Sequence, residues 1–150
     1  MPRVRASAVV PGPPEVAEAL WTDRGRWASW VDGFGHAASV DPTWPQAGAR
    51  VLWDSHPGGR GRVVEQVEAH EPGRLLELAV EDERIRGTQH VAFAPHPDGA
   101  TVTVVLEYAI KDRTALTPLV DLLFVRRAMG DSLRRTLARF RLEVRDEQDA

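Results

Sequence analysis

The stretch that decides the fold reads ATVTVVLEYAI at residues 100–110 and, after a short connection, LVDLLFVRRAMGDSLRRTLARFRLEV at residues 119–144. In the first segment apolar and polar side chains alternate, which is the period of a strand with one buried face. In the second, apolar residues recur every three or four positions, as in an amphipathic helix. The inward strand positions are Val102, Val104, Leu106, Tyr108 and Ile110, and the helix stripe is Leu119, Leu123, Leu133, Leu137, Phe140 and Val144.

The long helix has a start signal and one unusual interior residue. We expect Thr117 to cap it, with Pro118 in the first turn, where a missing N–H has no consequence. Its far face, rich in arginine and acidic residues, is expected to be solvated. Gly130 lies mid-helix, where glycine costs roughly 1 kcal/mol relative to alanine. A close approach to the sheet, a bend, or space left for a ligand would compensate this.

Upstream of residue 100 the period is also two, and turn signals recur between the apolar runs. The connections are too short for parallel crossovers, so the strands should form an antiparallel meander. Six strands fit, at residues 36–41, 49–55, 61–70, 74–81, 84–94 and 100–110. In the fifth of these strands, alternation places Gln89 on the same inward face as Val91 and Phe93, so a polar side chain is expected to face the interior.

The amino-terminal segment supplies one more strand and two short helices. Residues 3–10 alternate like a strand, which the prolines at positions 11, 13 and 14 end. A short helix over residues 15–21 follows. Asp23 is placed to cap a second one over residues 24–31, in which Trp27 and Trp30 share a face.

Composition narrows the class of protein. The 150 residues, 43% of them hydrophobic, suit one domain with one core over residues 1–150. A net charge of −3 provides no global positive field for nucleic acid or anionic lipid. The absence of cysteine excludes disulfides and thiolate metal sites and suits a reducing compartment. With no signal peptide or membrane span in the pattern, we expect a cytoplasmic protein without membrane insertion, as a monomer or homodimer.

Several of these segments resemble a known superfamily. VVP at residues 9–11, PEV at 14–16, ALW at 19–21, Asp23 and RWASW at 26–30 are similar to the opening signature of the polyketide cyclase/dehydrase and lipid-transport superfamily, also called START or Bet v 1-like (SRPBCC). VEQV at 64–67 through EPGRL at 71–75 resembles its middle hairpin, and DGATVT at 98–103 the turn into its last strand.

The resemblance implies an α+β helix-grip fold, a curved seven-stranded antiparallel sheet around the long helix, with a cavity between them. A single helix cannot fill the space on the concave side of so strongly curved a sheet. Independently of the resemblance, this argument favours a void that accepts a small hydrophobic molecule. For the apolar candidates core packing is the competing interpretation, above all for Trp30, which matches the family's tryptophan. The candidate ligand-binding residues are Trp30, Trp53, His56, Glu65, Gln89, Phe93, Leu106, Tyr108, Phe124, Met129 and Leu133.

Few of these candidates carry polar or titratable groups that could orient a ligand. Glu65 faces inward if Val63, Val67 and Ala69 mark the buried side of its strand, and the opposite parity is nearly as good, with a slight preference for a solvent-facing carboxylate. If inward, Glu65 joins Gln89 and Tyr108 as orienting groups, and burial raises its pKa. No metal or other cofactor is indicated, because no histidines have a metal-ligand spacing.

Among the histidines, His56 is the plausible proton-transfer group, because it lies in the glycine-rich loop SHPGGRG at residues 55–61, a candidate flap. His70, His90 and His96 are expected to be solvated.

Three functions compete. A carrier or binding protein for a small hydrophobic molecule (lipid, polyketide or isoprenoid-like) needs only the cavity and is best supported. A polyketide aromatase/cyclase-like enzyme would use the same cavity for cyclisation and dehydration. An interaction module of the chaperone-activator type would instead present an exposed apolar patch.

Overall fold

The computed structural model describes residues 1–112, 114 and 117–150. Within them, seven strands form one antiparallel sheet in the order β1-β7-β6-β5-β4-β3-β2. The strands are β1 (Arg3–Val10), β2 (Phe34–Val40), β3 (Arg50–Ser55), β4 (Arg62–Glu71), β5 (Leu75–Glu81), β6 (Ile85–His96) and β7 (Gly99–Ile110). The antiparallel meander is confirmed, and β2 begins two residues earlier than predicted because the chain pairs with β3 directly after the turn at Gly33.

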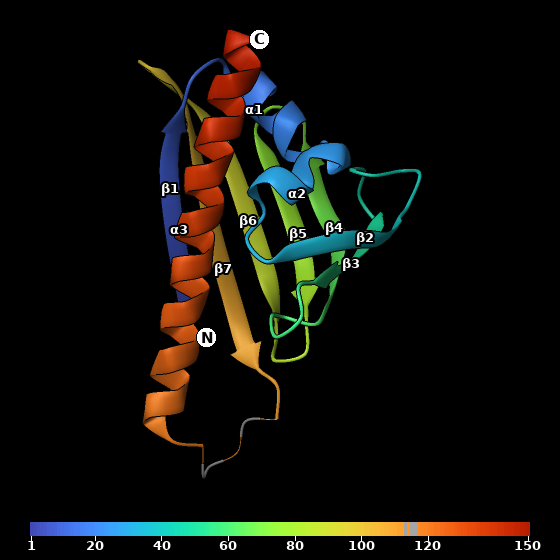
Figure 1. Ribbon diagram of the computed structural model, residues 1–150, viewed down its shortest axis with the longest axis vertical. Coiled ribbons are helices and arrows are strands. Elements are labelled where there is room, and N and C mark those ends of the chain that lie inside the picture. Colours follow the sequence, from blue (N-terminus) through green and yellow to red (C-terminus); the bar gives the residue numbers. More distant parts are fainter. Residues whose placement is uncertain (113, 115–116) are drawn as a thin grey trace.

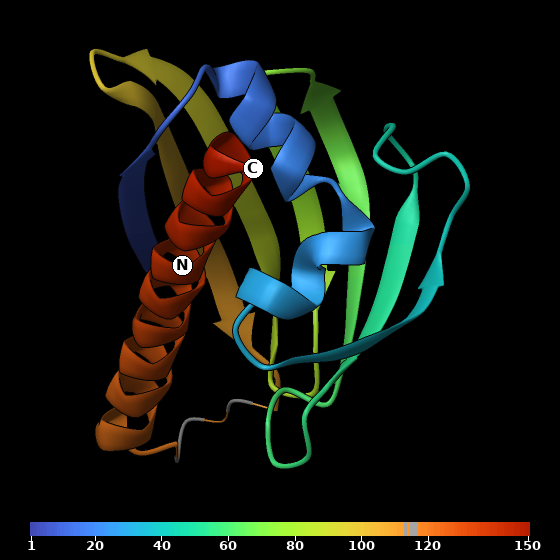
Figure 2. The same cartoon turned by 45° about the horizontal axis from the view of Figure 1, so that its top comes forward.

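The sheet bends strongly around the helices (Figure 2). Register shifts break the β2–β3 ladder between Phe34 and His36 and the β4–β5 ladder between Val67 and Ala69. Such bulges increase local twist and bend. At Gly87 of β6 the β7 backbone approaches so closely that a Cβ would lie 2.0 Å from the Glu107 carbonyl oxygen, so only glycine fits.

Three helical segments lie on the concave face (Figure 1). The first is α1 (Pro14–Trp21), which begins on the predicted proline. The second predicted helix is a 3₁₀ turn at Arg24–Arg26 followed by α2 (Trp27–Trp30), and Asp23 caps it as expected by accepting from the Gly25 N–H at 3.1 Å. The long α3 (Leu119–Asp149) is capped by Pro118 rather than Thr117, whose hydroxyl instead accepts from the Thr114 N–H.

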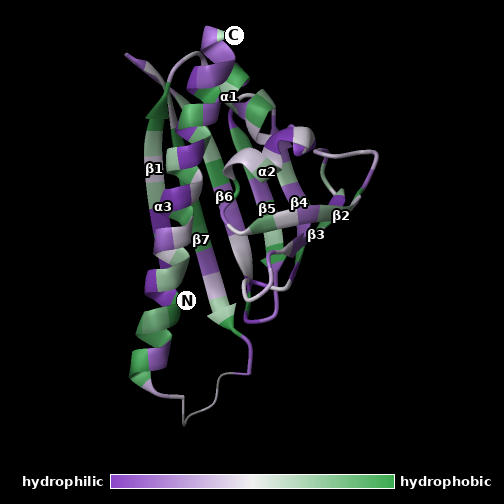
Figure 3. Ribbon diagram, in the orientation of Figure 1, coloured by the Kyte–Doolittle hydropathy of each residue, from purple (hydrophilic) through white to green (hydrophobic). Residues whose placement is uncertain are grey.

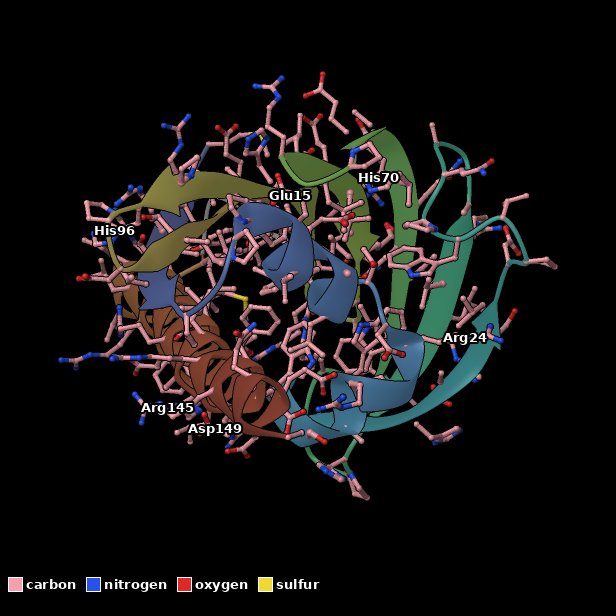
Figure 4. All side chains as sticks on the ribbon, turned by 90° about the horizontal axis from the view of Figure 1, so that it is seen from above. Glu15, Arg24, His70, His96, Arg145 and Asp149 are labelled. Carbon is pink, nitrogen blue, oxygen red and sulfur yellow. The ribbon has the colours of Figure 1, made fainter. Side chains whose placement is uncertain are left out.

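The core fills the space between the helices and the sheet, as the side chains in Figure 4 show. All four predicted inward positions of β7 from Val102 to Tyr108 are buried. Leu137, Phe140 and Val144 of α3 belong to the main cluster, with the tryptophans of α1 and α2. A smaller cluster at the other end of the sheet joins Val4, Ile85, Leu106, Tyr108 and Val125.

The first turns of α3 differ from the prediction. Figure 1 shows α3 running past the end of the sheet, and Figure 3 shows hydrophobic residues on that overhang. Leu119, Val120, Leu123 and Phe124 are 55–70% exposed, so Leu119 and Leu123 do not join the buried stripe. No helix among the described residues is both long and apolar enough to cross a bilayer.

Candidate functional site

A cavity with about 70 Å³ of free volume lies between α2, the sheet and the middle of α3. All five tryptophans of the chain contribute to its wall, from α1, α2, β3 and the β2–β3 connection. The sheet adds Phe34, Glu65, Leu78, Gln89 and Val104, the loops add Val31, Asp32 and Arg60, and α3 adds Ser132, Leu133 and Thr136. The wall therefore combines aromatic surface with a few polar groups, the composition typical of small-molecule sites.

The indole N–H groups around this cavity are not equivalent. Those of Trp27 and Trp44 donate to the backbone carbonyls of Trp21 and Thr22, both at 2.9 Å. That of Trp53 donates to Glu65 Oε1 at 3.2 Å. Trp30 is 2% exposed, and its Nε1 has no hydrogen-bond partner among the described residues. A buried donor without an acceptor is unusual and costs about 1–3 kcal/mol.

Trp30 is also a packing residue. Its ring lies 4.5 Å from that of Trp21 and 4.8 Å from that of Phe140, measured between centroids. These contacts join α1, α2 and α3, so Trp30 braces the short helices and lines the cavity at once.

Glu65 of β4 faces the cavity, so its side chain lies on the inner face of the sheet. The slight preference for a solvent-facing carboxylate was wrong, because Val63, Glu65 and Val67 share the inner face up to the bulge. Burial raises the pKa of Glu65, and the hydrogen bond from Trp53 and the charge of Arg60 only partly offset this. The cavity thus contains a carboxyl group that holds its proton more tightly than a solvated glutamate.

Arg60 closes one side of the cavity. Its guanidinium lies 5.5 Å from the centre of the Trp53 ring, and its Nε donates to Asp82 Oδ2 at 2.8 Å. Asp82 is buried and also accepts from the N–H groups of Arg84 and Ile85 at 2.8 and 2.9 Å. The β3–β4 loop is therefore held down over the cavity by a charged contact with the β5–β6 turn.

Asp32, just after α2, ties the opposite wall to α3. Its carboxylate accepts from Ser132 at 2.8 Å and from Arg135 and Arg139 at 3.1 Å. Burial alone raises the pKa of Asp32, but the hydrogen bonds from Arg135 and Ser132 and the charges of the two arginines outweigh it and lower the pKa. Arg135 thus pairs with Asp32 rather than with Asp131 on its own helix, which pairs with Arg134.

The predicted site residues divide into two groups. Trp30, Trp53, Glu65, Gln89 and Leu133 line the cavity. The others lie elsewhere: His56 is exposed on the β3–β4 loop, Phe93 packs against Trp21, Leu106 and Met129 belong to the smaller core cluster, Tyr108 lines a second cavity, and Phe124 is 64% exposed on the α3 overhang.

Sequence reasoning missed the charged wall groups and one buried pair. Arg60 and Asp32 lie in loops, where no periodicity assigns a direction. His70 was expected to be solvated, but its Nε2 lies 2.6 Å from Glu18 Oε1 of α1, and both side chains are nearly buried. Figure 4 labels His70 on β4 beside α1. The bulge after Val67 turns His70 inward, and sequence alternation does not reveal a bulge.

A family model described as polyketide cyclase / dehydrase and lipid transport matches residues 1–145. A search of curated proteins finds no match.

Solved structures share the whole fold at low identity. TTHA0849 from Thermus thermophilus matches with a TM-score of 0.77 and 19% identity, over 97% of this chain and 99% of that one. SA2116 from Staphylococcus aureus matches with a TM-score of 0.77 and 9% identity, over 99% and 96%. The di-domain ARO/CYC StfQ from the steffimycin biosynthetic pathway matches with a TM-score of 0.76 and 14% identity, over 99% of this chain and 52% of StfQ. These likenesses show a common helix-grip architecture.

Proposed function

Since this chain belongs to the polyketide cyclase / dehydrase and lipid transport family, we propose that it binds one small, oxygen-bearing hydrophobic molecule in the tryptophan-lined cavity. The observation that carries the proposal is Trp30, a residue of the cavity wall whose buried N–H has no acceptor among the described residues. A ligand carbonyl or phenol oxygen placed there would satisfy this donor. The indole rings supply flat apolar contact area, which suits a conjugated or aromatic body.

Gln89 and Glu65 give the ligand further orientation. Gln89 lies on the inner face of β6, and an amide both donates and accepts. Burial raises the pKa of Glu65, and its carboxyl accepts hydrogen bonds when ionised and donates one when protonated. A polyketide-like molecule, with several oxygens on an apolar skeleton, matches this wall better than a saturated lipid does.

The size of the cavity requires that it open. About 70 Å³ holds a few water molecules, whereas ligand sites typically reach about 300 Å³ or more. The structure therefore corresponds to a closed state. The β3–β4 loop contains Pro57, Gly58 and Gly59 and is held to the β5–β6 turn by Arg60, so its release is the route of entry that we propose.

The proposal is tested by calorimetric titration of the protein with planar polyphenols, isoprenoid alcohols and fatty acids. We expect a polyphenol or aromatic ketone to bind with one-to-one stoichiometry. Trp30→Phe keeps the ring packing and removes the N–H, so it should weaken binding about 3- to 10-fold, the effect of one hydrogen bond of about 1 kcal/mol.

Trp27→Phe is the matched control, because the Trp27 N–H is already bonded to a carbonyl in the protein. Equal affinity of Trp30→Phe and the wild type for every ligand that binds would refute the role given to the Trp30 N–H. Failure of the whole panel to bind would refute the proposed function.

A polyketide aromatase/cyclase-like enzyme is the second candidate, and the juxtaposition of Glu65 with Arg60 favours it. A carboxyl group with a raised pKa can donate a proton to a leaving hydroxyl, and a guanidinium can stabilise a developing enolate. Glu65→Gln separates the two functions. Glutamine keeps a hydrogen-bond donor and an acceptor at this position but cannot transfer a proton, so the variant should still bind the ligand in either case. It should abolish cyclised product formation from a reactive poly-β-ketone only if the protein is an enzyme.

A further inference from the structure

A groove runs along one edge of the sheet, between β1 and the first half of α3. β1 is the outermost strand at this edge, and α3 lies beside it (Figures 1 and 2). The groove has a volume of about 450 Å³ and shares no lining residue with the tryptophan-lined cavity. Its lining residues are Arg3, Val4, Arg5, Leu123, Arg126, Arg127, Gly130 and Arg134.

The groove is basic, although the chain as a whole has a net charge of −3. Five of its eight lining residues are arginines, and none of the eight is acidic. Arg3 pairs with Glu107, and Arg134 pairs with Asp131. The other three arginines are exposed and form no ion pair with any acidic residue that the structure describes: Arg5, Arg126 and Arg127. Such a local excess of positive charge attracts a partner with several carboxylates.

The backbone of β1 also has unpaired groups along this edge. The Tyr108 N–H donates to the Pro2 carbonyl at 3.1 Å, and the β1–β7 register continues without a shift from Arg3 to Val10. Hydrogen bonding alternates along an antiparallel pair, so every second residue of β1 turns its N–H and C=O toward β7 and the next turns them outward. The residues whose backbone groups turn outward, where no described strand pairs with them, are Arg3, Arg5, Ser7 and Val9.

An extended peptide that adds antiparallel to this edge matches both features. A residue directly opposite Arg5 exchanges two hydrogen bonds with it and has its side chain on the same face of the sheet, so a carboxylate there pairs with the guanidinium. The residues before and after it turn toward α3. Gly130 leaves room for their side chains, because an added Cβ at this position would meet only the end of the Arg134 side chain, at 3.4 Å.

We propose that the β1 edge binds an acidic, extended segment of a partner protein, which adds to the sheet as a strand antiparallel to β1. The backbone hydrogen bonds supply affinity, and the arginines of β1 and α3 select acidic side chains. A phosphate chain matches the charge of the groove, but it offers no donors to the carbonyls of the edge. The inference is independent of the function proposed for the tryptophan-lined cavity.

The probe is a fluorescein-labelled heptapeptide in which glutamate alternates with valine, with glutamate at both ends. By fluorescence polarisation we expect saturable binding that weakens as the concentration of sodium chloride rises. The same peptide with lysine in place of glutamate should bind about tenfold more weakly or worse. Amide hydrogen exchange locates the site: the peptide should protect the Arg5 and Ser7 amides, whereas the Ala6 amide, which points toward β7, should be protected already in the free protein.

Two N-methylated versions of the heptapeptide separate strand addition from charge attraction. With glutamates opposite Arg3 and Arg5, the glutamate N–H groups point to β1 and the valine N–H groups point away. Methylation of the valine nitrogens should therefore leave the affinity unchanged. Methylation of the glutamate nitrogens should weaken binding about tenfold or more, because several hydrogen bonds of about 1 kcal/mol each are lost at constant charge.

Variants of the protein test the arginines. Arg5→Gln and Arg127→Gln should each weaken heptapeptide binding about 2- to 5-fold, the effect of one exposed ion pair, and replacement of Arg5, Arg126 and Arg127 together should weaken it about tenfold or more. Arg141→Gln is the matched control, because Arg141 is exposed on the same helix and lies outside the groove. This variant should bind the peptide like wild type.

Equal affinities of the two methylated peptides would overturn strand addition, as would Arg5 and Ser7 amides that stay unprotected. Wild-type affinity in the triple variant, or equal binding of the lysine peptide, would overturn the selection of acidic partners. Tighter binding of a single-stranded oligonucleotide than of the heptapeptide would overturn the proposal in favour of a nucleic-acid site. None of these outcomes bears on ligand binding among the tryptophans, so the two proposals fail separately.

Discussion

Glu65 is the cavity residue whose ionisation makes the stability of the protein depend on pH. Its carboxyl faces the tryptophan-lined cavity, and burial raises its pKa above the ordinary value of 4.5. The folded state therefore binds this proton more tightly than the unfolded state does. The stabilisation is fully present below the ordinary pKa and is lost as the pH rises through the raised folded value.

We predict that Glu65→Gln becomes more stable relative to wild type as the pH increases from about 4 to 8, because glutamine stays neutral in both states. The measurement is the free energy of unfolding by urea at several pH values. Glu68→Gln, exposed on the same strand, is the matched control. A difference between Glu65→Gln and wild type that stays constant across this pH range would show that the Glu65 carboxyl is not buried as described.

Gly130 allows a second prediction for a single residue. It is a buried residue inside α3, and an added Cβ would meet only the end of the Arg134 side chain, at 3.4 Å. Alanine should therefore fit, and Gly130→Ala should raise the free energy of unfolding by about 0.5–1 kcal/mol. Ala138→Gly, at an exposed position of the same helix, should lower it by a similar amount. Destabilisation by Gly130→Ala would show that α3 requires glycine to approach β1.

At the scale of elements, the strands and helices were predictable because their signals are local. Alternation in β7, the prolines that start α1 and the cap at Asp23 each depend on a few adjacent residues. The bulge after Val67 does not, and it reverses the facing of His70. The burial of His70 against Glu18 therefore became visible only with the folded sheet.

The β3–β4 loop lies over the cavity and is held to the β5–β6 turn by one charged contact. Arg60→Ala removes the contact with Asp82 that holds the loop over the cavity. We expect the association rate of a cavity ligand, followed by tryptophan fluorescence in a stopped-flow instrument, to rise several-fold. The free energy of unfolding should fall by about 1–3 kcal/mol, because buried Asp82 loses a charged partner.

Arg62→Ala is the control for this experiment. Arg62 lies two positions away and pairs with Asp54 in an exposed contact, which contributes about 0–1 kcal/mol. Its association rate should equal that of wild type. An unchanged or slower rate in Arg60→Ala would mean that ligands do not enter beneath this loop.

At the scale of the whole molecule, the fold could be predicted and the site only in part. The order of strands and helices follows from periodicity and turn signals, and the family model agrees with it over residues 1–145. Asp32 and Arg60 join the cavity because the sheet closes around α3 and brings separate loops together. Phe124 was expected at the ligand site but lies on the overhang of α3 beyond the sheet. Helical periodicity predicts which face of a helix is apolar, but it does not predict where the sheet beneath that face ends.

The central claim is that the tryptophan-lined cavity binds a small hydrophobic molecule. Native mass spectrometry tests it most directly, on freshly purified protein and after incubation with the polyphenol, isoprenoid and fatty-acid panel, each compared with denatured protein. We predict a one-to-one adduct that is released on denaturation, contains oxygen on a hydrophobic skeleton, and is diminished in Trp30→Phe. The mass of the bare chain in every sample would contradict the claim and would favour a protein-interaction role for the exposed apolar start of α3.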